Sequence, residues 1–369
     1  MCVRALVCIV AGTTLSAAQA RFEPTPRVVA PGRDPSLAVR ASGAVSMLAV
    51  EKGDLWLLTS FDGGDSFEQR VRVNDVAGEV ASYGENSPRL HMRSRSEVYC
   101  LWQARAGESG GSALRVARSA DWGETFEKSV LVNAGAPASQ AFSALNVSPR
   151  GQVYVAWLDG RERGGGHAGT SALYLARSAD RGRSFEPSVR VSGDVCPCCR
   201  PSIAFTGEQT VHVAFRGVTG DHIRDILIAT SHDGGATWGQ PVRVAEDNWR
   251  IHGCPHSGAS LAVLGKRLFV SWYTVREGHG AIYYAWSDDS GRTFSERRPL
   301  SEAVIDANHP HLLPVGDTIL AVFQGREPDQ NQGWGKIGAY YREIDAGGAA
   351  APIRIEPAKA SASYPVIAF

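Results

Sequence analysis

Short apolar segments recur along this chain in sets of four, and the members of a set differ in pattern. The second segment of each set is an almost unbroken apolar run, as in 98–102, which is typical of a strand buried on both faces. The fourth segment alternates apolar and charged residues, as in Val189-Arg190-Val191, which is typical of a half-exposed strand. The pattern predicts six small sheets, whose second strands are 45–50, 98–102, 153–157, 211–215, 268–272 and 319–323.

A turn motif, Ser-x-Asp-x-Gly-x-Ser/Thr-aromatic, separates the third and fourth segments in five of these sets. Its Asp can accept hydrogen bonds from backbone N–H groups a few residues on, and its Gly takes the positive φ that closes a turn. The first serines are 59, 59, 53 and 56 residues apart, and a period of this size indicates a stacked or circular array in one domain. The copies are Ser60–Phe67, Ser119–Phe126, Ser178–Phe185, Ser231–Trp238 and Ser287–Phe294.

The repeat resembles the Asp-box, or bacterial neuraminidase repeat, of the sialidase superfamily, over roughly residues 30–357. In that family the box joins the third and fourth strands of each blade, on the face away from the active site. The resemblance therefore implies an all-β fold, a six-bladed β-propeller of four-stranded antiparallel blades. Blade six has only Asp345-Ala346-Gly347-Gly348 in place of a box, and either 27–30 or 364–369 could close the ring.

Composition narrows the class of protein further. The chain has 369 residues with 38 basic and 38 acidic side chains, and the zero net charge argues against nucleic acid as a partner. Arg4, the apolar run 5–11 and Ala18-Gln19-Ala20 predict a secretory signal peptide over residues 1–20. No later segment is apolar for the roughly 20 residues that a membrane span needs. We therefore expect a single propeller domain, residues 21–369, that is periplasmic or secreted.

Cysteine and histidine gather in the segments that precede the first strands of blades four, five and six. First strands line the channel of a propeller, so we expect three neighbouring blades to bring these side chains together. Thiolate and imidazole suit copper or zinc, and purely soft sites favour Cu(I). The alternative is structural, with Cys254 in a disulfide to one of the other cysteines and the histidines satisfying polar groups. The candidate metal ligands are Cys196, Cys198, Cys199, His252, Cys254, His256, His309 and His311.

Arginines on the same predicted face form a second candidate set, because guanidinium groups can hold a carboxylate bidentately. The sialidase resemblance implies three such arginines with a tyrosine nucleophile, and the catalytic candidates are Arg200, Arg276, Arg326 and Tyr364. The chain departs from the family where Asp34 stands in place of the first arginine, which argues against sialidase activity. The arginines of this face are Arg89, Arg105, Arg161, Arg163, Arg200, Arg216, Arg224, Arg276 and Arg326.

Three functions remain open on the sequence. The first is an exported sialidase-like propeller that binds a ligand or a soft metal ion, copper or zinc, without sialidase activity. The second is an exo-α-sialidase-type glycoside hydrolase acting on terminal sialic acids. The third is a non-catalytic protein-interaction scaffold, since a fold alone does not fix a function. A glycan or another small molecule is the expected ligand of the first two.

Overall fold

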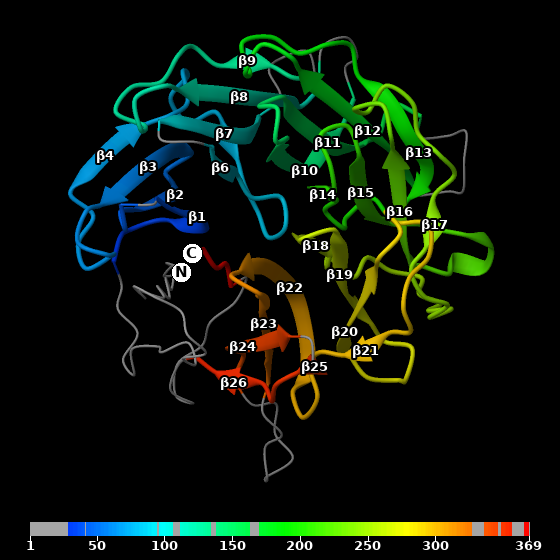
Figure 1. The fold of residues 1–369 in the computed structure, drawn as a ribbon. Helices are drawn as coiled ribbons and strands as arrows, with labels where there is room; N and C mark the ends of the chain where they lie inside the picture. Colours follow the sequence, from blue (N-terminus) through cyan, green and yellow to red (C-terminus); the bar gives the residue numbers. More distant parts are fainter. Residues whose placement is uncertain are drawn as a thin grey trace.

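Six antiparallel sheets follow one another around a ring, as the repeat predicted (Figure 1). The computed structural model describes residues 29–40, 42–93, 96–105, 111–133, 138–162, 170–326, 336–345, 348–355 and 365–368. In these ranges the only helix is a short 3-10 turn, η1 (Gly220–His222), and no helix there is long and apolar enough to cross a membrane. The fold is thus all-β, a six-bladed propeller.

Each blade is built from consecutive strands, with the first nearest the centre of the ring and the last at its rim (Figure 1). Blades one to three contain β1 (Arg33–Val39), β2 (Val45–Glu51), β3 (Asp54–Ser60), β4 (Gln69–Arg72); β5 (Val80–Ala81), β6 (Arg89–Arg93), β7 (Glu97–Ala104), β8 (Ala113–Ser119), β9 (Val130–Leu131); β10 (Gln140–Val147), β11 (Val153–Asp159), β12 (Ser171–Ser178) and β13 (Val189–Val195). Blades four to six contain β14 (Ser202–Phe205), β15 (Val211–Arg216), β16 (Ile226–Ser231), β17 (Val242–Arg243); β18 (Ser260–Leu264), β19 (Arg267–Thr274), β20 (Ala281–Ser287), β21 (Arg298–Pro299); β22 (Ile305–Val315), β23 (Thr318–Arg326), β24 (Gly338–Asp345), β25 (Gly348–Ala349) and β26 (Ile353–Arg354).

Blades two and six depart from the predicted four strands. In blade two, β5 extends the sheet by pairing with β7 beyond the end of β6. In blade six, both β25 and β26 pair with β24, where one outer strand was expected. The first strand of blade six also starts early, so His309 and His311 lie within β22 and not ahead of it. Two irregularities in the β22–β23 register, with His309 at φ 53°, allow the strand to continue through them.

The second strands supply the core, as their apolar pattern predicted. Trp102, Trp157 and Trp272 lie at matching places in β7, β11 and β19 and are fully buried. Two of the three indole N–H groups donate to a carboxylate. Trp157 donates to Asp159 at 2.8 Å, and Trp272 donates to Asp247 at 2.7 Å. These two contacts satisfy donors that burial would otherwise make costly, whereas the indole N–H of Trp102 has no partner among the described residues.

Serine hydroxyls join the inner strands of neighbouring blades. Ser36 accepts the backbone N–H of Leu90 at 3.1 Å, and two further pairs repeat the contact: Ser202 with Leu261 at 3.2 Å and Ser260 with Leu312 at 3.0 Å. The bonds occupy backbone donors that face the channel, where no further strand can pair with them. The inner strands of these neighbouring blades are therefore tied to each other around the axis.

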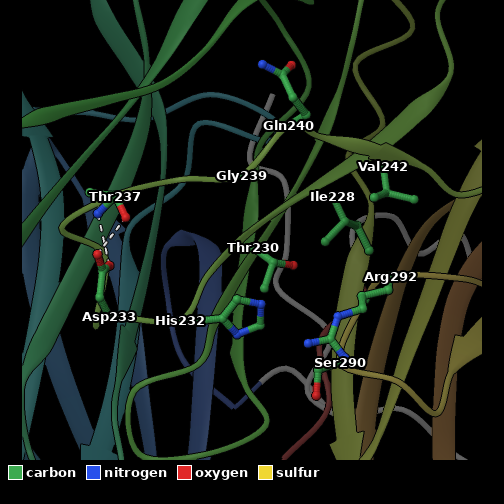
Figure 2. A pocket seen from close by; sticks show the side chains of 11 residues that line it. Ile228, Thr230, His232, Asp233, Thr237, Gly239, Gln240, Val242, Ser290 and Arg292 are labelled. Carbon is green, nitrogen blue, oxygen red and sulfur yellow. Dashed lines mark hydrogen bonds between the residues drawn. The ribbon is translucent and has the colours of Figure 1, made fainter.

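The five boxes fold as their sequence predicted. In blade four, the Asp233 carboxylate accepts the backbone N–H and the hydroxyl of Thr237, at 2.9 and 2.6 Å (Figure 2). Ser231 accepts the N–H of Gly235, which has a φ of 87°. A pocket of about 320 Å³ lies between this box and that of blade five, where His232 and Arg292 are among its lining residues (Figure 2). Because strand direction alternates within a blade, the boxes lie on the face opposite the blade-to-blade crossings.

The segment 365–368 lies at the channel beside blade six. Ile367 packs in a cluster with Val315, Tyr341 and Ile355, and its N–H donates to the Nδ1 atom of His311 at 3.3 Å. The segment does not join a sheet, so in the described residues no strand from 365–368 pairs with a terminal blade. Of the other segment considered for ring closure, 27–30, the structure describes Val29 and Ala30, which pack against Met47 and Ala49 of blade one and belong to no strand.

Candidate metal centre

Six of the eight predicted ligands, all but His309 and His311, lie on crossings, the loops that run from the outer strand of one blade to the inner strand of the next. Cys196, Cys198 and Cys199 lie between β13 and β14, and Cys254 and His256 lie between β17 and β18. These two crossings enter and leave blade four. Their common face is the one opposite the boxes, so the chain topology brings the two loops to the same end of the blade.

Three thiols form a buried triangle. The sulfur of Cys196 lies 3.5 Å from that of Cys198 and 3.7 Å from that of Cys199, and the Cys198–Cys199 separation is 4.0 Å. All three residues are at most 3% exposed and pack in an apolar cluster with Phe215 and side chains of blades three and four. The triangle is therefore shielded from bulk water on its inner side.

The sulfur separations fit a single shared metal ion. An ion about 2.3 Å from three sulfurs places them about 3.8–4.0 Å apart, in tetrahedral or planar arrangement. A disulfide would need about 2.05 Å, and all five described cysteines are free thiols. The fifth of them, Cys100, is fully buried in the core of blade two, as expected of an apolar filler.

A fourth thiol and an imidazole meet the triangle at its open edge. Ligand atoms of Cys198, Cys254 and His256 all lie within 4.8 Å of one another. Cys254 and His256 are exposed, in contrast to the buried triangle. His256 has a φ of 49°, a left-handed conformation that costs free energy in a residue other than glycine. The set thus has a dry interior with three sulfurs and a solvent-facing edge with one sulfur and one ring.

A guanidinium group supplies the charge that the thiols need. Arg224 is 8% exposed and donates from Nη1 to the Cys196 sulfur at 2.8 Å. Hydrogen bonds from the Cys198 and Cys199 thiols, and then the Arg224 charge, lower the pKa of Cys196. Burial raises the pKa of Cys199, which sits deeper. The arrangement favours a thiolate at Cys196, and the thiolate is the form that ligates metals.

A second arginine fixes the two crossings relative to each other through hydrogen bonds. Arg216 is 1% exposed and donates to three backbone carbonyls, those of Arg224 at 2.9 Å, Ser257 at 3.1 Å and Tyr273 at 2.7 Å. Its own carbonyl accepts the N–H of Cys196 at 2.8 Å. One side chain therefore ties the arginine beside the thiols to the loop that carries Cys254 and His256.

The remaining predicted ligands have other neighbours. The ring of His252 contacts that of His222, with the centroids 4.2 Å apart. His309 Nδ1 lies 3.2 Å from the buried carboxylate of Glu85, which also accepts the N–H groups of Arg200 and Gly258. Burial and then the Arg200 charge lower the pKa of His311 to about 4. Five of the eight predicted ligands therefore share one cluster, and the other three lie beside it or in the channel.

The channel itself contains a cavity of about 550 Å³, which both polar and apolar side chains line. Arg89 and Arg200 both donate to the carbonyl oxygen of Glu85, each at 3.3 Å, and Asp34 lines the same cavity. Burial alone would raise the pKa of Glu85, but the bond from His309 and the Arg200 charge bring it below its usual value. This carboxylate is therefore ionised at neutral pH.

The other catalytic candidates have partners of their own. Arg276 is exposed and donates to the carbonyl of Glu246 at 3.1 Å. Arg326 pairs with Asp306 at 3.5 Å. Tyr364 lies outside the described residues. The catalytic assignment of these residues, with Arg200, stays a prediction.

No family model and no curated protein matches the sequence, but solved structures match the fold. The α-L-arabinofuranosidase Arb93A from Fusarium graminearum aligns with 87% of this chain and 92% of its own, at 14% identity and a TM-score of 0.53. The Hadza microbial sialidase Hz136 aligns at 17% identity and a TM-score of 0.52, over 79% of this chain. The fold is sialidase-like. This chain spans 63% of that sialidase's own length. A third match, an α-L-arabinanase of Penicillium chrysogenum, covers 83% of this chain and 92% of its own at 14% identity and a TM-score of 0.50.

Three features of this sialidase-like propeller were not assigned from sequence. Arg216 and Arg224 were grouped with arginines that could hold a carboxylate, yet one contacts backbone carbonyls and the other a sulfur. Glu85 was not singled out, because a lone Glu in a polar loop carries no pattern. His222 was also missed, since nothing in its local sequence links it to His252, 30 positions later.

Proposed function

We propose that this chain is an exported, sialidase-like propeller that binds a soft metal ion, Cu(I) in the first place, through a cluster of four cysteines and His256. Soft thiolate ligands select Cu(I) or zinc over hard cations. The Cys-x-Cys-Cys spacing is unlike the spacing of zinc ribbons, and this favours copper. The proposal needs no sialidase chemistry, in keeping with Asp34 at the place of the first family arginine.

One observation carries the proposal: three buried sulfurs lie 3.5–4.0 Å apart, with a fourth thiol and an imidazole at their open edge. Buried cysteines are common as apolar filler, but three that face each other are not explained by packing. Arg224 beside Cys196 offsets the negative charge that ligating thiolates would bring into an apolar cluster.

The expected location supports the same conclusion. Thiols within 4 Å of each other are prone to oxidation outside the cytosol. A bound ion would keep them from pairing as disulfides. Conversely, a protein that carried the set only for stability would be expected to use the disulfide.

The test is metal analysis of the protein purified from the periplasm without oxygen. We expect close to one Cu(I) per chain, bound tightly enough to withstand a colourless competing chelator, and loss of that ion in Cys198→Ser. Cys100→Ser serves as the matched control, because Cys100 is a buried thiol far from the cluster in the core of blade two. Zinc in place of copper would change the metal but retain the site. Equal metal in the wild type, Cys198→Ser and Cys100→Ser would overturn the proposal.

A glycoside hydrolase is the second candidate, favoured by the channel cavity. Two carboxylates, Asp34 and Glu85, line the same space as Arg89 and Arg200, and the neighbouring folds include a sialidase and an arabinofuranosidase. Fluorogenic sialosides and arabinofuranosides test it directly. Turnover that vanishes in Arg200→Ala, with metal content unchanged, would establish this function beside or in place of the first.

A further inference from the structure

His222 and His252 form a pair of exposed imidazoles that no role has yet accounted for. Their ring centroids are 4.2 Å apart, with the planes inclined at 47°. Neither ring has a hydrogen bond or ion pair with another described residue. Paired imidazoles that serve only to fill space are usually buried or bonded to a carboxylate, and these two face solvent.

The backbone holds the two rings together. The N–H of Ile251 donates to the carbonyl of His222 at 3.1 Å, and Ile223 and Arg250 form an antiparallel bridge. Asp221 pairs with Arg250 at 3.3 Å across the same two segments. The pair is therefore set by main-chain pairing and does not depend on chance contact between flexible side chains.

The backbone of the turn that carries His222 is strained. Asp221 and His222 are consecutive residues at φ 60° and 59°, and neither is glycine. Such conformations cost free energy in residues other than glycine and persist mainly where the surroundings, or a function, require them. The strained turn carries His222, whose ring contacts that of His252.

We propose that His222 and His252 bind a divalent transition-metal ion at a second site, beside the exposed edge of the thiol cluster. Neutral imidazole suits Zn(II), Cu(II) and Ni(II), and an ion at 2.0–2.1 Å from two nitrogens needs them about 3 Å apart. With the ring centroids 4.2 Å apart, rotation of the exposed side chains is enough to direct one nitrogen of each ring at a shared ion. His252 is two residues from Cys254, the exposed thiol of the cluster, so the second site lies at its entrance. Only this placement beside the cluster rests on the proposed function; binding at the pair does not.

Zinc titration of the full mature chain tests the proposal by counting ions. We expect His222→Ala and His252→Ala each to bind one Zn(II) fewer than the wild type, or to bind it about tenfold or more weakly. The control is His232→Ala, which removes an exposed histidine on the box face and should change nothing. Circular dichroism checks that each variant is folded, which is expected because these side chains are exposed.

The same titration in a variant that lacks the thiol cluster separates the two sites. In Cys198→Ser the thiol cluster is broken, and the zinc that remains should disappear when His222→Ala is added. If Cys198→Ser does not fold, Cys254→Ser replaces it, because that thiol is exposed. A wild type with one zinc that only the His variants remove would support the His222–His252 site and show that the thiol cluster does not take zinc, so the Cu(I) analysis above decides the thiol site. Zinc binding that is the same in the wild type, His222→Ala and His252→Ala would overturn the inference.

Discussion

Replacing Arg224 by Gln should weaken metal binding without unfolding the blade. Arg224 is the cation in contact with the thiol cluster, at 2.8 Å from the Cys196 sulfur. At an effective dielectric constant of about 20, two unit charges at this distance attract by about 6 kcal/mol, which is an upper limit. A hydrogen bond to a charged group contributes about 1.5–3 kcal/mol net, so we expect the Cu(I) dissociation constant to rise about ten- to hundredfold.

Competition with a coloured Cu(I) chelator under nitrogen measures the effect. Arg224→Lys keeps the charge and should recover part of the affinity, which a purely structural role for the planar group would not allow. The control is Arg267→Gln, which removes the same charge on the box face, where Arg267 pairs with Asp288. We expect that control to stay within about twofold of the wild type, because salt screens charges over such distances. An Arg224→Gln protein that is folded and binds as tightly as the wild type would refute the reasoning.

Further predictions follow from burial and from the boxes. Iodoacetamide should label Cys254 in the native protein and reach the three buried thiols only after unfolding; mass spectrometry of peptides would show otherwise if the triangle were open. Phe215→Ala should lower the free energy of unfolding by about 3–5 kcal/mol, measured in urea, since Phe215 is fully buried against the thiol crossing. In the fifth box, bonds from Thr293 lower the pKa of Asp289 to about 2. The stability that this carboxylate contributes is therefore present above its usual pKa of 3.8 and lost as pH falls through about 2. Asp289→Asn should flatten the dependence of the melting temperature on pH between pH 4 and pH 2, and an unchanged slope would contradict this.

The scaffold was predictable because its signals are local and repeated. A box such as Ser231–Trp238 contains the whole of its own turn, from the Asp233 acceptor to the Gly235 corner, and five copies confirm each other. The buried second strands are recognisable in the sequence as unbroken apolar runs. Blade six was less well predicted, because β22 continues through two irregular pairs that leave no apolar pattern.

The site was predictable only in part, because its contacts join distant residues. The cysteines stood out as a rare residue type in short segments, and the topology brings Cys196 near Cys254 as expected. The placement of His309 depended on where β22 begins, and a strand that starts at Ile305 turns this ring towards Glu85 in the channel. Arg224 could not be assigned to a sulfur, since its sequence neighbours do not distinguish a thiolate partner from a carboxylate.

The two crossings that carry the cysteines enclose one complete blade, from β14 to β17. Blade four therefore brings Cys199 and Cys254 together when its four strands pair, since the two residues flank its first and last strands. During synthesis, Cys196, Cys198 and Cys199 would be made before blade four, and Cys254 and His256 would be made after it. An ion held by both crossings would then link the two ends of blade four and slow the unfolding of that blade.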